Sequence, residues 1–175
     1  MSESQKPIWN SLEVAKLAVS AMTPILVCIL GVSINSSIKT VDLRREIYKE
    51  VGSSLNDIYC YTAFIGQWKE LTPLDVLARK RRVDAAIYTY KPFFSKALLT
   101  AYNNYMEASF ATYGEAGSDA QIQSAVVTAD GDRTRHSLRS WDPLWEKRFT
   151  QKENRAQQQI TYDAFIGQLA KDLNL

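Results

Sequence analysis

Two clusters of basic residues are the parts of this sequence best suited to binding an anion. The first, Arg79-Lys80-Arg81-Arg82, places four successive cations around one helical turn, so at least one of them points toward the apolar side of its helix. The second alternates cations with indole rings, which suits a nucleotide or single-stranded oligonucleotide through phosphate pairing and base stacking. The second cluster comprises Arg133, Arg135, Arg139, Trp141 and Trp145, with Lys147 and Arg148 beside them.

Two other interpretations of these clusters stay open. Basic side chains bind lipid headgroups at a membrane surface, and they also form local ion pairs on solvated faces of a protein. Asp84, Asp142 and Glu146 lie close enough along the chain to serve as such ion-pair partners.

The sequence lacks the residue patterns of the common catalytic sites. Its single histidine, His136, would need an arginine five to seven residues earlier to match a helical R-x4-6-H nuclease, and those positions hold Ala129, Asp130 and Gly131. One histidine and two distant cysteines provide no zinc site, and no phosphate-cradling glycine loop or nucleophile elbow occurs. We therefore expect no enzymatic activity, no metal and no cofactor.

The longest apolar stretch, residues 17–34, contains no formally charged side chain. As a helix it would cover about 27 Å, close to the thickness of the hydrocarbon core of a bilayer. We predict a transmembrane helix over residues 17–35, preceded by a tail of residues 1–16. One alternative is a cleaved signal peptide, although no cleavage site is obvious, and another is a buried helix of a soluble bundle.

Charge and cysteine content indicate where the remainder of the chain lies. The 21 basic and 19 acidic residues nearly balance, which argues against a dedicated duplex-DNA binder. Cys28 lies within the predicted span and Cys60 beyond it, so a disulfide is not expected, as suits a reducing compartment. Four basic residues follow the span and two precede it, which predicts a single-pass membrane protein with residues 36–175 in the cytoplasm. The four are Lys39, Arg44, Arg45 and Lys49, and the two are Lys6 and Lys16.

One face of the predicted span consists of small or polar residues. They recur at intervals of three or four, and the opposite faces carry leucine and isoleucine. Because small residues let membrane helices approach closely, we predict a homo-oligomer in which this face meets neighbouring copies of the span. The face either packs directly against those helices or lines a water-filled pore. The alternative is an isolated anchor whose hydroxyls bond to their own backbone. The residues are Lys16, Ser20, Thr23, Val27, Gly31 and Asn35.

The spacing of apolar residues predicts that residues 36–175 form an all-α bundle of four or five helices. The long helices are expected over residues 39–69, over residues 73–90 with Thr72 as N-cap, from Ser95 to Gly114, and over residues 153–173. A short helix and a loop are expected in residues 115–139, and Asp142-Pro143 opens another short helix. Only Val126-Val127-Thr128 resembles a strand.

A short tail, one span with a small and polar face, and a helical cytoplasmic domain with basic clusters but no active site together resemble the small membrane effectors of bacterial phage-defence systems. The Hailong-type effector channels and the CRISPR-accessory membrane pore proteins are similar in this architecture. The resemblance implies that cytoplasmic domains assemble into a ring, that the spans form or gate a channel, and that infection changes a nucleotide or oligonucleotide signal. The missing Arg-His nuclease motif favours the signal-gated channel.

We therefore expect an oligomeric membrane effector of antiviral defence that forms a gated pore or ion channel. Its expected partners are membrane lipid, further copies of the chain, and a nucleotide or single-stranded oligonucleotide held by the two basic clusters. The alternative is a membrane-tethered scaffold without enzymatic activity. It uses residues 141–149 to recruit a cytoplasmic partner protein that is encoded by a nearby gene.

Overall fold

The computed structural model describes residue 22 and residues 41–111 and 120–174. The chain forms two compact units, Met1–Leu43 and Arg44–Leu175, and the description below concerns the second. Of the predicted span, only Met22 is described, as a helical residue with an exposed side chain. None of the helices in the described ranges has the length and apolar character needed to cross a membrane.

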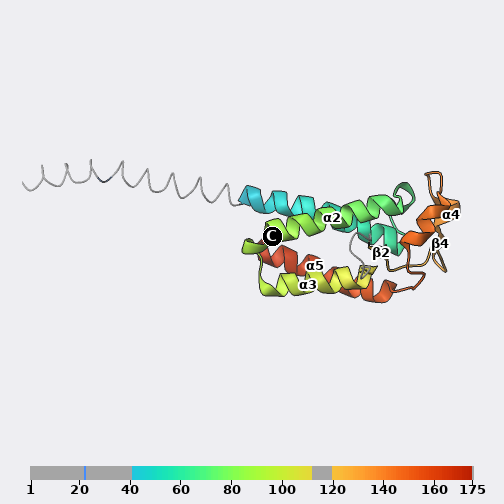
Figure 1. The fold of residues 1–175 in the computed structure, drawn as a ribbon. Coiled ribbons are helices and arrows are strands. Elements are labelled where there is room, and N and C mark those ends of the chain that lie inside the picture. The colour runs from blue at the N-terminus through green and yellow to red at the C-terminus, as the bar shows by residue number, and fades with distance from the viewer. Residues whose placement is uncertain (1–21, 23–40, 112–119, 175) are drawn as a thin grey trace, which may run out of the picture. The chain divides into compact units, whose positions relative to one another are not determined.

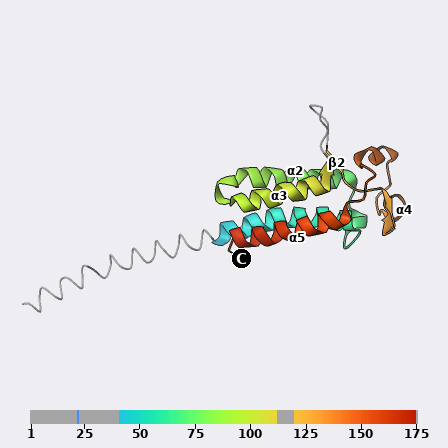
Figure 2. The same ribbon diagram turned by 90° about the horizontal axis from the view of Figure 1, so that it is seen from below.

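Four long helices make up most of the second unit. Residues 41–63 are helical, and they are followed by α2 (Pro73–Thr89), α3 (Lys96–Ser109) and α5 (Arg155–Asp172). The four helices lie side by side, and most of the short elements gather near one end of them (Figures 1 and 2). This mostly helical architecture confirms the all-α class expected from the apolar spacing.

The starts of the helices agree with their predicted caps. The Thr72 hydroxyl accepts the amide of Asp75, whose carboxylate in turn accepts the amide of Thr72, which completes a capping box at the start of α2. Ser95 caps α3 in the same way by accepting the amide of Leu98. Both caps are local in sequence, which explains why the residue types predicted them.

Two helices end earlier than predicted. The helix of residues 41–63 stops before Phe64, which takes a left-handed conformation with φ of 57°, and Gly66 repeats that conformation. A 3-10 helix, η1 (Trp68–Glu70), follows in place of the predicted continuation to residue 69. α3 ends at Ser109 and not at Gly114, because Phe110 begins a strand.

Short strands and turns form the end region of the unit. β1 (Phe110–Ala111) pairs antiparallel with β2 (Gln121–Ile122), and β3 (Val127–Thr128) pairs antiparallel with β4 (Gly131–Asp132). α4 (Arg133–His136) follows β4 directly, and η3 (Pro143–Arg148) begins after the N-cap residue Asp142. A third 3-10 helix, η2 (Lys91–Phe93), joins α2 to α3.

The core runs along the inner faces of the four long helices and includes a set of aromatic rings. The rings of Tyr59 and Tyr162 stack with centroids 4.2 Å apart, and Tyr105 meets both Tyr162 and Phe165. The tyrosines of α3, Tyr102 and Tyr105, are therefore part of the core, in line with the apolar bodies of these side chains. Fully buried aliphatic residues complete it, among them Val51, Leu55, Ile58, Val76, Val83, Ile87, Leu98, Ile122 and Leu169.

Candidate anion-binding groove

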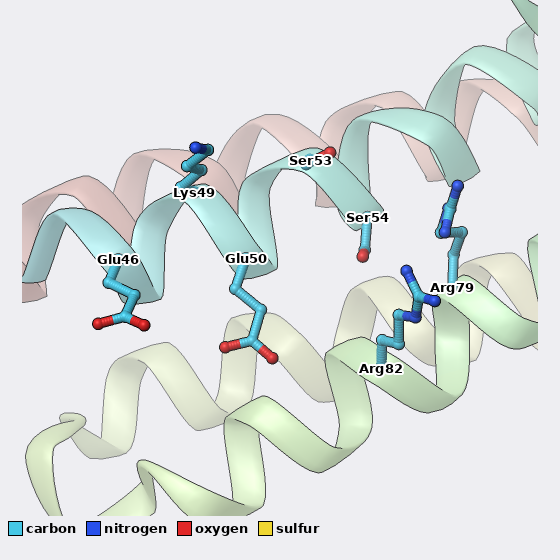
Figure 3. A pocket seen from close by; sticks show the side chains of 7 residues that line it. All are labelled: Glu46, Lys49, Glu50, Ser53, Ser54, Arg79 and Arg82. Atoms are coloured by element: carbon cyan, nitrogen blue, oxygen red, sulfur yellow. The ribbon is translucent and has the colours of Figure 1, made fainter. Parts of the chain in front are cut away.

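An open groove of about 760 Å³ lies between the helix of residues 41–63 and α2. Its volume falls in the range of small-molecule sites. Figure 3 shows that Glu46, Glu50 and Ser54 point toward α2, and that Arg82 rises from α2 toward Ser54. The lining residues are Glu46, Lys49, Glu50, Ser53, Ser54, Arg79 and Arg82.

Arg79 is held in place by a buried carboxylate. Asp57, which is 6% exposed, accepts a hydrogen bond of 2.8 Å from Arg79 Nε and one of 2.5 Å from Gln67 Nε2. The bond to Asp57 uses the guanidinium nitrogen nearest the main chain, so the two terminal nitrogens lie beyond it and can meet a ligand. Such an ion pair orients the guanidinium before any ligand arrives.

Arg82 lies one helical turn from Arg79 on the exposed surface of α2. Within the described part of the chain, no ion pair or hydrogen bond engages the side chains of Arg82, Glu46 or Glu50. Two arginines on adjacent turns can hold one phosphate between them, since the guanidinium group bonds phosphate oxygens through paired N–H groups. Arg79 and Arg82 therefore form the basic end of the groove.

The other two residues of the first cluster do not share this groove. The Lys80 amine pairs with Asp84 at 2.7 Å and lies 5.7 Å from the ring centroid of Phe110. The second oxygen of Asp84 accepts the Tyr102 hydroxyl at 2.7 Å. Arg81 is exposed on α2 and is not among the residues that line the groove. The local ion pairing considered for this cluster thus applies to Lys80.

Arg133, from the second cluster, is 1% exposed and points into the core. Its two terminal nitrogens donate to the main-chain carbonyls of Ala125, at 2.5 Å, and Tyr61, at 2.9 Å. The guanidinium lies 3.8 Å from the ring centroid of Phe64 and 5.4 Å from that of Phe149. Burial lowers the pKa of Arg133 to about 10, so the cation persists at neutral pH. With its two terminal nitrogens engaged inside the protein, Arg133 serves the fold, while its buried Nε has no hydrogen-bond partner among the described residues.

The other members of the second cluster differ in exposure and in their contacts. Arg135 is exposed and pairs with Asp132 at 3.3 Å, and Arg139 is also exposed. Trp141 is half-buried against the core, with its ring at 5.4 Å from that of Trp145 in an edge-on arrangement. Because Arg133 is buried and Trp141 packs inward, the two side chains best placed in sequence to combine charge and stacking do not form an open platform.

The acidic residues of the groove are the part of the site that was not predicted from the sequence. Asp57 is buried and pairs with Arg79. Glu46 and Glu50 carry a detectable signal, since their spacing of four puts them on one side of the helix, followed by Ser54. The predicted pore or interface residues Lys16, Ser20, Thr23, Val27, Gly31 and Asn35 lie outside the described residues.

Among the described residues, no group of three or more histidine, cysteine or acidic side chains is placed to hold a metal ion. No protein-family model, curated protein sequence or solved structure matches this chain significantly.

Proposed function

We propose that this chain is an oligomeric effector of the bacterial inner membrane, controlled by a nucleotide or oligonucleotide that binds the groove between residues 41–63 and α2. In this proposal residues 17–35 span the bilayer once, and residues 36–175 lie in the cytoplasm. The protein has no enzymatic activity of its own. Its action is to open or close a pore in bacterial antiviral defence.

The observation that carries the proposal is the pair of arginines at the basic end of the groove. Arg79 is preset by the buried Asp57, and Arg82 is exposed beside it. Preset guanidinium groups bind phosphate with less loss of side-chain entropy than mobile ones. The ligand residues proposed here are thus Arg79 and Arg82, whereas Lys80 and Arg133 have partners within the protein.

The proposed pore rests on the small and polar face of the predicted span, where Ser20 and Thr23 offer hydroxyls. We expect replacing both with leucine to abolish ion flux through liposomes that contain the purified protein, because leucine offers no groups to bond water. A matched control replaces Ile25 and Ile29, on the opposite face, with leucine and should conduct normally. Unchanged flux in the Ser20→Leu, Thr23→Leu variant would remove these residues from a pore.

A second candidate function is the membrane-tethered scaffold that recruits a protein through residues 141–149. Leu144 in η3 is 64% exposed and Leu138, shortly before it, is 72% exposed, which favours a protein contact there. Replacing both leucines with serine separates the two functions. If the chain is a scaffold, the variant no longer arrests growth in cells, and neither the natural protein nor the variant conducts ions in liposomes. If the chain is a pore, the variant keeps both growth arrest and ion flux.

A further inference from the structure

We infer that the groove selects a nucleotide that carries an exocyclic amino group on its base, with the phosphate at Arg79 and Arg82 and the amino group at Glu46 and Glu50. This inference rests on the proposed function and adds the chemical class of the ligand. It follows from the charges that face α2 along the groove, with Glu46 and Glu50 at one end and Arg79 and Arg82 at the other (Figure 3). Lys49 also lines the end with the glutamates, but its side chain points away from α2.

The antiparallel arrangement of the two helices produces this separation. The bond between Asp57 and Arg79 fixes which turns face one another, so Ser54 lies near Arg82 and the two glutamates face the later turns of α2. After Arg82, α2 contains no further basic residue. Glu46 and Glu50 therefore have no cation opposite them on that helix, in contrast to Asp57.

The two glutamates repel a ligand that carries only negative charge. From Ser54, Glu50 lies about 6 Å along the helix axis and Glu46 about 12 Å, distances at which a carboxylate still repels a phosphate held at Arg82. Ionised carboxylates accept hydrogen bonds and cannot donate them. A ligand that reaches both ends must therefore present an anion to the arginines and a hydrogen-bond donor to the glutamates.

A nucleoside monophosphate with an amino-bearing base meets both requirements. Its phosphate and its base lie at opposite ends of the molecule, and the groove is large enough for one. A glutamate accepts a hydrogen bond from the N4 amino group of cytosine, whereas uracil presents a carbonyl oxygen at that position and would be repelled. Cytidine and uridine monophosphates thus form a matched pair of probes.

The test is calorimetric titration of the full-length protein in detergent with four probes: cytidine monophosphate, uridine monophosphate, phosphoethanolamine and inorganic phosphate. We expect cytidine monophosphate to bind at least about fivefold more tightly than uridine monophosphate. Glu50→Gln should bring this ratio close to one, because glutamine can both donate and accept. Glu107→Gln, an exposed glutamate on α3, is the matched control and should keep the ratio.

The outcomes separate the inference from the proposed function. If both nucleotides bind equally and Arg82→Gln weakens both, the inference is overturned and the anion site of the proposed function stands. If Arg82→Gln leaves binding unchanged, or none of the probes binds, the groove is not the signal site and both fail. Tighter binding of phosphoethanolamine than of cytidine monophosphate would overturn the inference in favour of a lipid headgroup. Glu50 and Arg82 are both exposed, so their replacement leaves the core untouched.

Discussion

Arg133 keeps a full positive charge inside the protein by bonding to main-chain carbonyls. Among the described residues no carboxylate pairs with it, and the rings of Tyr61, Phe64 and Phe149 surround the guanidinium. Tyr61 lies in the last turn of the helix of residues 41–63, where carbonyl groups lack helical partners and the helix dipole favours a cation. Arg133 therefore ties the start of α4 to the end of that helix.

We expect Arg133→Met to lower the free energy of unfolding by about 2–4 kcal/mol, because it leaves the buried carbonyls of Tyr61 and Ala125 without their charged donors. Chemical denaturation of the full chain in detergent, followed by tryptophan fluorescence, measures the change. Arg135→Met is the control. Its side chain is 83% exposed, so a change within about 0.5 kcal/mol is expected. Equal effects of the two substitutions would contradict this account.

At the residue scale, the sequence shows where the basic residues stand in the chain but not whether each is buried or which residues it contacts. Arg79 and Arg133 both stand in runs of cations, yet one lines a groove and the other lies in the core. The difference depends on residues distant in the chain, namely Asp57 for Arg79 and Tyr61 for Arg133. Local spacing carries no information on such long-range partners.

At the scale of elements, Asp172 joins the end of α5 to the start of α3. Its carboxylate accepts the Ser95 amide at 2.6 Å, the Ser95 hydroxyl at 3.0 Å and Gln168 Nε2 at 2.8 Å. Partial burial raises the pKa of Asp172, but these hydrogen bonds outweigh it and bring the pKa below 3.8. The contact thus favours the ionised carboxylate in the folded state.

We expect Asp172→Asn to change how the stability of the protein depends on acid. Because the folded-state pKa is lowered, the contribution of Asp172 is fully present at a pH well above the ordinary pKa of an aspartate and is lost as the pH falls through the folded-state pKa. The difference in the free energy of unfolding between the natural protein and the variant should shrink from about pH 5 to about pH 2. Denaturation curves at a series of pH values measure it, and a difference independent of pH would contradict the prediction.

The sequence predicted where helices begin better than where they end. Thr72 and Ser95 cap through bonds to residues three positions later, so a short pattern identifies them. The end of the helix at residue 63 depends on Phe64, a residue type that seldom adopts a positive φ. Phe64 is held there by its contacts with Arg133 and Gly131, which lie much later in the chain.

At the scale of the whole molecule, the predicted orientation in the membrane can be tested directly. With residues 17–35 as the only span and residues 36–175 in the cytoplasm, a tag added after residue 175 should resist protease in intact spheroplasts. It should become sensitive once the membrane is permeabilised, because the bilayer no longer separates it from the enzyme. A tag placed before residue 1 should be cleaved in both conditions. A C-terminal tag cleaved in intact spheroplasts would reverse the proposed orientation.

The helical class could be predicted from apolar spacing alone, because each long helix shows its buried face in its own sequence. The groove could not. It depends on which turns of two antiparallel helices face one another, and the ion pair between the buried Asp57 and the half-buried Arg79 sets that register.

The packing of Phe64 on Gly131 has a consequence for how this protein can diverge. A Cβ atom at position 131 would lie 2.7 Å from the Phe64 ring, closer than real side chains approach one another. Any relative with a larger residue at 131 must therefore carry a smaller one at 64, and that loss would remove a ring from beside Arg133. Positions 64, 131 and 133 should covary among relatives as one unit, while the residue type at position 135 should vary independently of them.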